Sequence, residues 1–96
     1  MTFGTALELL KMGLAVRHSS WNEEEFIYLT TGTEVSRENL RGNCAKFHPS
    51  DYERNTINIS SHIDKHISEE KITIGWVPTA EEMFSDEWYV YNDFKN

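Results

Sequence analysis

The sequence is poor in cysteine, proline and basic residues. Its 96 residues include one cysteine, Cys44, two prolines, and nine Lys and Arg residues against sixteen Asp and Glu residues, so the formal net charge is −7. A lone cysteine excludes an intramolecular disulfide and suits a reducing compartment. The few basic residues are scattered, which argues against nucleic-acid binding, because phosphate contacts draw on clustered cations. An acidic protein could instead mimic nucleic acid and occupy a DNA-binding enzyme.

Long hydrophobic runs are also lacking. The opening residues "MTFGTALELLKMG" have neither a basic n-region nor an extended apolar stretch, so we expect no signal peptide, no membrane span and a cytoplasmic protein. With 39% hydrophobic and 12% aromatic residues, the chain should nevertheless fold around a core. Its length predicts one domain over residues 1–96.

The first third of the chain predicts a helix and two strands. Apolar residues recur at helical spacing from Phe3 to Leu14, with Thr2 as N-cap and Gly13 as C-cap glycine. "LAVRHSSW" and "EFIYLTTG" then have the character of strands. The second has apolar side chains on both faces, so we expect it to be central or to lie in a subunit interface.

Residues 34–55 form a polar stretch, which we predict to be a long loop. Ser36 could cap one short turn carrying Leu40, and the composition of the rest favours irregular structure. A loop of this length in a small domain is usually functional or mobile.

The last third predicts three more strands, a helix and a closing strand. The strands are "TINIS", "HIDKHI" and "KITIGWV", and alternation places Ile72, Ile74 and Trp76 on one face. Thr79 and Glu82 form a capping box for a short helix after Pro78. "EWYVYND" closes the chain as a strand. The predicted fold is α+β, a small antiparallel sheet with two short helices.

Metal and catalytic sites are not expected. His62 and His66 stand four apart in a predicted strand, which separates them by roughly 13 Å, too far for one ion. Cys44 and His48 lack the signature of a thiol nucleophile, and the runs of glutamates suit solvated surfaces. We therefore expect a protein that is not an enzyme and uses neither metal nor cofactor.

The tryptophans suggest a binding site for a small ligand. Trp76 precedes a helix start at Thr79, where free N–H groups favour an anion and an indole could stack on a base. Trp21 is followed by Asn22, whose amide both donates and accepts hydrogen bonds. Packing in a core is the alternative for each tryptophan.

Two further candidates extend this site. Arg17 lies four residues before Trp21 and could pair with a phosphate. Tyr28 adds an aromatic ring from the neighbouring strand. Together these residues indicate a pocket at strand ends that suits a nucleotide.

Both ends of the chain resemble one family. "MTFGTALELLKMGLAVRHSSWN" matches its opening pattern M-x-F-G-x-A-L-x-x-L-K-x-G followed by W-N, and "GWVPTAEEMFSDEWYVY" resembles its closing pattern around W-x-P-[ST]. On these motifs, which span about half the chain, the sequence resembles the Thoeris anti-defence 2-like family of small phage and bacterial proteins.

The resemblance implies a function as a sponge. Members are expected to form homo-oligomers, with tetramers known, and to capture without catalysis the cyclic ADP-ribose signal that TIR-domain proteins make in infected bacteria. Some relatives trap cyclic oligonucleotides. The pockets lie between subunits, and by motif position their residues correspond to Trp21, Asn22, Trp76 and Thr79.

The sequence departs from the family at two places. The usual turn W-N-G-K-G is "WNEEE" here, so Glu23–Glu25 replace two glycines and a lysine. The stretch at about 34–55 is longer than expected for compact members. We interpret it as a lid, a subunit contact or an ornament of this chain.

Overall fold

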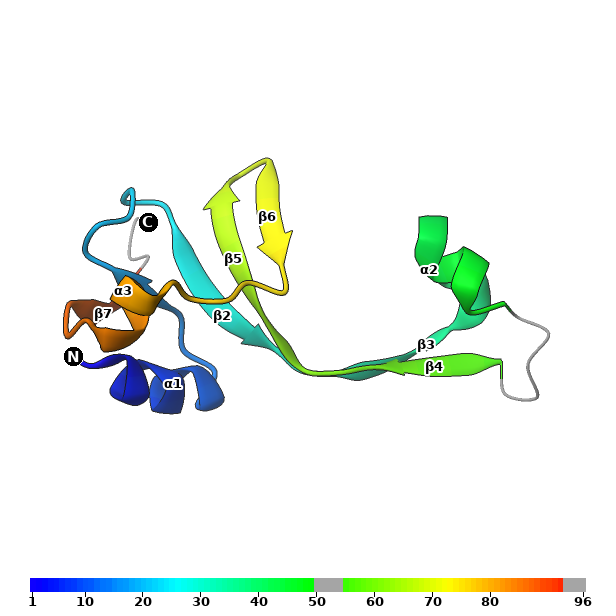
Figure 1. Ribbon diagram of the computed structural model, residues 1–96, viewed down its shortest axis with the longest axis horizontal. Coiled ribbons are helices and arrows are strands. Elements are labelled where there is room, and N and C mark those ends of the chain that lie inside the picture. Colours follow the sequence, from blue (N-terminus) through cyan, green and yellow to red (C-terminus); the bar gives the residue numbers. More distant parts are fainter. Residues whose placement is uncertain (50–54, 93–96) are drawn as a thin grey trace. The chain divides into compact units, whose positions relative to one another are not determined.

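The computed structural model describes residues 1–49 and 55–92, which fall into two compact units (Figure 1). The sheet unit comprises Met1–Thr30 and His62–Asn96, and the hairpin unit comprises Thr31–Ser61. The elements of the sheet unit are α1 (Phe3–Lys11), β1 (Val16–His18), β2 (Phe26–Thr30), β5 (His62–Ser68), β6 (Lys71–Ile74), α3 (Ala80–Phe84) and β7 (Trp88–Val90). Those of the hairpin unit are β3 (Thr33–Ser36), the 3-10 helix η1 (Arg37–Asn39), α2 (Gly42–Phe47) and β4 (Thr56–Ile59). That the chain is a single domain stays a prediction.

The sheet unit is built on five antiparallel strands in the order β6-β5-β2-β1-β7. β2 is therefore the central strand, as its two apolar faces predicted. The mixture of helices with this sheet confirms the α+β class. Glu69 and Glu70 form the turn between β5 and β6, as the polar composition of that stretch indicated.

Helix α1 covers one face of the sheet and supplies part of the core. The side chain of Thr2 accepts a hydrogen bond from the backbone N–H of Thr5, and Gly13 has φ of 87°, so both predicted caps are present. Ala6 and Leu10 of α1 are buried together with Val16, Ile27 and Trp88 of the sheet. Figure 1 shows α1 and α3 close together near β7, and the two helices are in contact.

The opposite face of the sheet, which we call the open face, carries aromatic and aliphatic side chains. Because side chains alternate along a strand, Arg17 and Phe26 point away from their buried neighbours Val16 and Ile27. In β6, Ile72 and Ile74 are 48% and 68% exposed. The helices that the structure describes in the sheet unit pack on the core side.

The predicted alternation of Ile72, Ile74 and Trp76 is wrong. Ile72 pairs with His66 and Ile74 with Asp64 on the open face, whereas Trp76 packs against the core. The reason is Gly75, whose φ of 77° interrupts the alternation of side chains. The next side chain, that of Trp76, therefore points to the core side of the sheet. β6 accordingly ends at Ile74.

The prediction of a loop over residues 34–55 is also wrong for most of its length. β3 pairs with β4 in antiparallel register from Thr33↔Ile59 to Ser36↔Thr56, and α2 follows η1. The hydrogen bonds of β3 go to a strand about twenty residues away, so the local composition does not reveal them. Ser36 precedes the predicted turn but makes no side-chain cap hydrogen bond. Residues 50–54 of the predicted loop lie outside the described residues.

Candidate functional site

The three tryptophans pack on one another on the core side of the sheet. The ring centroids of Trp21 and Trp76 are 5.6 Å apart, those of Trp21 and Trp88 5.2 Å, and those of Trp76 and Trp88 6.3 Å, all with edge-to-face geometry. Trp88 is fully buried, and Trp21 and Trp76 are half-buried. Trp88 is thus a core residue, while Trp21 and Trp76 form the rim of the same cluster.

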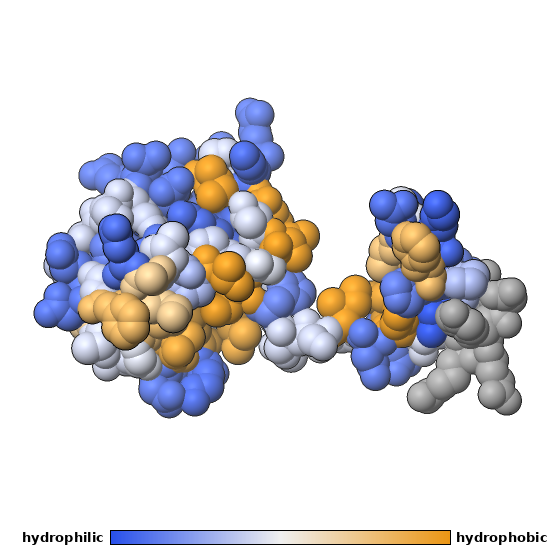
Figure 2. Space-filling view, viewed as in Figure 1, coloured by the Kyte–Doolittle hydropathy of each residue, from blue (hydrophilic) through white to orange (hydrophobic). Residues whose placement is uncertain are grey.

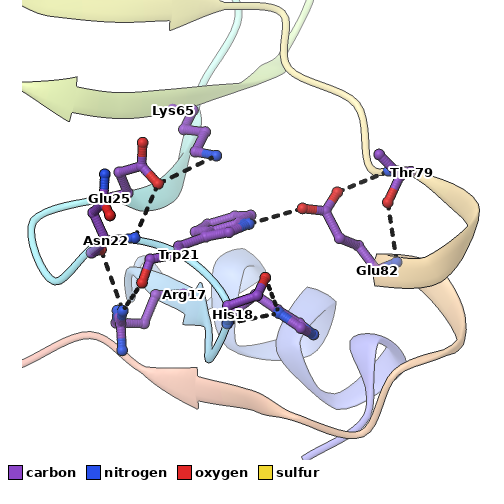
Figure 3. Close-up of polar contacts among 9 residues, drawn as sticks. Arg17, His18, Trp21, Asn22, Glu25, Lys65, Thr79 and Glu82 are labelled. Carbon is purple, nitrogen blue, oxygen red and sulfur yellow. Dashed lines mark hydrogen bonds and ion pairs between the residues drawn. The ribbon is translucent and has the colours of Figure 1, made fainter.

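The ring of Trp21 already has partners within the chain (Figure 3). Its indole N–H donates to a carboxylate oxygen of Glu82 at 2.8 Å, and the ammonium of Lys65 lies 3.8 Å from the ring centroid. Glu25 approaches the same ammonium at 3.9 Å. A base could stack on that face of Trp21 only by displacing Lys65.

Thr79 closes the capping box that the sequence predicted. Its hydroxyl accepts from the backbone N–H of Glu82 at 3.1 Å, and its own N–H donates to the Glu82 carboxylate at 2.8 Å. This arrangement places a protein carboxylate at the start of α3, where a ligand phosphate was expected. A phosphate at this place would meet the negative charge of Glu82.

The pKa of Glu82 reflects these contacts. Partial burial raises the pKa of the carboxyl, but hydrogen bonds from Thr79 and Trp21 and the positive charge of Lys65 outweigh that effect. The net result is a pKa below the ordinary value of 4.5. Glu82 is therefore held as a carboxylate, in the role of a structural acceptor.

Arg17 links the Trp21–Asn22 turn to the open face. One nitrogen of its guanidinium, Nη2, donates to the carbonyl oxygens of Trp21 and Asn22, at 2.8 and 3.2 Å. The Nε of Arg17 is buried, and among the described residues it has no hydrogen-bond partner. The turn itself is closed by the N–H of Asn22 donating to Glu25, so glutamate takes a structural role in the altered turn.

A cavity of about 330 Å³ lies next to this guanidinium. It is lined by Arg17, Glu23, Val90, Tyr91 and Asn92. The cavity combines a permanent cation, a carboxylate, an amide and an aromatic ring. A polar ligand with a planar ring matches that combination.

An aromatic stack continues from the cavity across the open face. The rings of Tyr91 and Phe26 are stacked with centroids 4.1 Å apart, and Phe26 and His66 are stacked at 4.6 Å. Tyr28 lies beside Phe26 at 6.1 Å with tilted rings. Sequence reasoning missed Tyr91, Phe26 and His66 as site residues. Alternation placed each on a strand face, but only the strand pairing shows that these faces are the same one.

The six predicted site residues therefore separate into two groups. Trp21 and Trp76 meet on the core side, and Thr79 is connected to them through Glu82. Arg17 and Tyr28 belong to the open face. Asn22 lies exposed in the turn whose carbonyl oxygens accept hydrogen bonds from Arg17. The structure joins Trp21, Trp76 and Thr79 on one side of the sheet. It joins Arg17 to Asn22, and Tyr28 shares the open face with Arg17.

The sequence also predicts that the protein has neither a metal site nor a membrane span. In the described ranges, no group of three or more His, Cys, Asp or Glu side chains is arranged to hold a metal ion. His62 and His66 lie along β5, the strand that the sequence predicted. None of the described helices has the length and apolar character required to span a membrane.

The comparisons with known proteins give one finding. No curated protein matches the chain. The profile of the Thoeris anti-defense 2-like (Tad2-like) domain matches residues 1–91, which includes both terminal motifs, the cavity residues Arg17 and Tyr91, and the whole hairpin unit. The chain therefore belongs to the Thoeris anti-defense 2-like family.

Proposed function

We propose that this protein is a non-catalytic sponge for a cyclic ADP-ribose-type signalling nucleotide. The family name implies a role against Thoeris defence, and sequestering the signal in the cytoplasm of the infected bacterium would fulfil that role. The single observation that carries the proposal is the cavity in which Arg17 and Tyr91 stand together.

The chemistry of this cavity suits a nucleotide. A base stacked on the ring of Tyr91 would contribute ~1–3 kcal/mol. The guanidinium of Arg17 is oriented by two carbonyls of the turn, and its remaining N–H groups can donate to a phosphate or ribose oxygen. Glu23 lines the same cavity and can accept hydrogen bonds from ribose hydroxyls.

A second copy of the chain would complete the site. Pockets that hold drug-sized ligands measure about 300–1,000 Å³, and the cavity here, at about 330 Å³, is at the lower end of that range. A dinucleotide needs more enclosing surface than one copy provides. Closure by another subunit agrees with the homo-oligomer, expected to be a tetramer, that the family resemblance implies.

The rim of the tryptophan cluster is a second candidate binding position for the nucleotide. Trp76 is half-buried, and the exposed Thr79 lies nearby through the contacts of Glu82. A ligand here would stack on Trp76 and avoid the carboxylate of Glu82. The two placements make different predictions for the same experiment.

Calorimetry with a panel of cyclic ADP-ribose isomers and cyclic oligonucleotides tests the proposal. Tyr91→Ala should weaken binding about 10- to 100-fold, the equivalent of one lost stacking contact. Tyr89→Ala is the matched control, because Tyr89 lies two residues before Tyr91, is 51% exposed and does not line the cavity. If Trp76→Ala abolishes binding and Tyr91→Ala leaves it unchanged, the second placement is correct.

Recovery of the ligand separates a sponge from an enzyme. The protein is incubated with the nucleotide and then denatured by heat. Intact nucleotide in the supernatant supports sequestration, and a chemically altered product would contradict it. No binding of any nucleotide, together with a stable complex with a host enzyme, would favour the acidic inhibitor instead.

A further inference from the structure

The turn between β1 and β2 carries three consecutive glutamates, which differ in their surroundings. Glu25 accepts a hydrogen bond from the N–H of Asn22 and lies 3.9 Å from the ammonium of Lys65. Glu24 and Glu23 are both exposed, but only Glu23 lines the cavity. Figure 2 shows hydrophilic surface on the sheet unit where Figure 1 places this turn, at the upper left. Of the three carboxylates, that of Glu23 is therefore the one presented to a ligand in the cavity.

The carboxylate of Glu23 is available to bind that ligand. In the described ranges it forms no hydrogen bond or ion pair with another residue, although the guanidinium of Arg17 lines the same cavity. The guanidinium is held instead by the carbonyl oxygens of Trp21 and Asn22. An ionised carboxylate only accepts hydrogen bonds and a guanidinium only donates them. The cavity therefore presents an acceptor and a separate donor.

This separation of charge determines how a nucleotide fits. A phosphate matches the guanidinium of Arg17 in charge and geometry. A ribose with free 2′ and 3′ hydroxyls matches the carboxylate of Glu23, since two adjacent O–H groups can donate to its two oxygens. Dinucleotide-binding folds use an acidic side chain on a ribose hydroxyl in the same way. A phosphodiester facing Glu23 would meet a like charge and would have no proton to donate.

Cyclic ADP-ribose and cyclic oligonucleotides differ in this part of the ligand. In a cyclic ADP-ribose, the ribose distal to the adenosine keeps both its 2′ and its 3′ hydroxyl. In a cyclic oligonucleotide, each ribose has one of these hydroxyls esterified in a phosphodiester, so no ribose keeps the pair. A carboxylate in the cavity consequently favours the first class and disfavours the second.

We propose that Glu23 is the specificity-determining residue of the cavity. It accepts hydrogen bonds from the 2′,3′-diol of a ribose and disfavours nucleotides whose riboses are esterified at these positions. The guanidinium of Arg17 holds the phosphate end of the same ligand. This inference rests on the proposed function and adds to it the chemical group by which the ligand is selected.

Calorimetry on a pair of isosteric variants tests the proposal. Glu23→Gln keeps the size of the side chain and removes its charge. Glu24→Gln removes the same charge from the neighbouring residue, which does not line the cavity, so it controls for the general effect of charge. The probes are the cyclic ADP-ribose isomer that the wild type binds most tightly and 3′,3′-cyclic diadenylate, which has no free ribose diol. The measured quantity is the ratio of the Kd for cyclic diadenylate to the Kd for the cyclic ADP-ribose isomer.

The wild type should bind the cyclic ADP-ribose isomer more tightly than cyclic diadenylate. Glu23→Gln should lower the ratio of the two Kd values about tenfold or more, because hydrogen bonds to the diol lose their charge assistance and repulsion of the phosphodiester is lost. Glu24→Gln should change the ratio less than about twofold, because its exposed charge is screened by solvent. Where the wild type has no measurable affinity for cyclic diadenylate, the Kd of Glu23→Gln for the cyclic ADP-ribose isomer should exceed that of Glu24→Gln about fivefold or more.

The outcomes separate this inference from the proposed function. An equal change of the ratio in both variants, or none in Glu23→Gln, would overturn the inference, while tight binding of cyclic ADP-ribose by the wild type would leave the proposed function intact. If the wild type binds neither class of nucleotide, both fail. If Trp76→Ala abolishes binding and Glu23→Gln leaves it unchanged, the nucleotide lies at the tryptophan rim and Glu23 does not select it.

Removal of a hydroxyl from the ligand gives a second measurement. An analogue of the cyclic ADP-ribose isomer that lacks one hydroxyl of the distal ribose should bind the wild type about tenfold more weakly than the parent nucleotide. The same change should weaken binding to Glu23→Gln less than about threefold, because the interaction between this residue and the hydroxyl is already impaired. Equal losses in both proteins would show that the hydroxyl is recognised elsewhere and would overturn the proposal.

Discussion

The sheet unit and the hairpin unit differ in how far their side chains are buried. All seven buried residues in the part of the chain that the structure describes, five apolar and two polar, belong to the sheet unit. The described part of the hairpin unit is held by backbone pairing of β3 with β4 and by short-range hydrogen bonds, with no buried side chain. The sheet unit therefore contains the buried core, and the described part of the hairpin unit contains no buried residue.

Loss of the central tryptophan should have the largest effect. Trp88→Ala removes a fully buried ring that contacts Phe3, His18 and Trp21, together with its hydrogen bond to the Glu82 carbonyl. We expect the free energy of unfolding to fall by about 3–5 kcal/mol, measured by urea denaturation. Phe47→Ala in the hairpin unit, where Phe47 is 64% exposed, should cost less than about 0.5 kcal/mol. Similar losses of unfolding free energy in both variants would contradict the view that the buried core lies in the sheet unit.

A glycine substitution should disturb the hairpin unit alone. A Cβ on Gly32 would lie 2.5 Å from the carbonyl oxygen of Ile59, so Gly32→Ala forces the two chain segments apart. The expected cost is about 1–3 kcal/mol, visible in hydrogen exchange as lost protection of β3 and β4 with β2 and β5 unchanged. Gly4→Ala is the control, since its nearest neighbour would be 3.8 Å away. Equal loss of protection in both units would show that they unfold together.

The capping box should make the sheet unit sensitive to acid. Because the pKa of Glu82 is lowered in the folded protein, the carboxylate contributes stability that is present above its unfolded pKa near 4.5 and is lost as pH falls below it. Glu82→Gln should cost about 1 kcal/mol at pH 7, and its Tm should approach that of the wild type as the solution is acidified. Glu8→Gln, on the exposed side of α1, controls for removal of a charge. A Tm difference that stays constant with pH would contradict this role of Glu82.

Excision of the hairpin unit should have the smallest effect. Thr30 and His62 lie directly opposite each other in the ladder between β2 and β5, so an Asn-Gly turn can replace residues 31–61. The shortened chain should keep the stability of the sheet unit within about 1 kcal/mol, measured by thermal unfolding. An unfolded product would show that the sheet unit needs the hairpin unit.

Local signals allowed much of the sheet unit to be predicted. The caps of α1 at Thr2 and Gly13, the central position of β2 and the capping box of Thr79 and Glu82 all follow from residues a few positions apart. These features depend on short-range hydrogen bonds and on periodicity, which a single sequence displays.

Features that depend on distant partners could not be predicted. The composition of β3 predicts a loop, because its partner β4 lies beyond a polar stretch. The cavity brings Arg17 together with Tyr91 from the other end of the chain. No local sequence pattern indicates that these two residues lie close together. The carboxylate of Glu82 was recognised as a cap, but its contact with Trp21 joins residues 61 positions apart.

Gly75 interrupts the alternation by which successive side chains of a β-strand point to opposite faces of the sheet. Before it, the even-numbered Ile72 and Ile74 face solvent, and after it, the even-numbered Trp76 joins the core. Substitutions at Ile72 or Ile74 therefore change the exposed side of β6 without replacing a side chain of the tryptophan cluster, although only one residue separates Ile74 from Trp76.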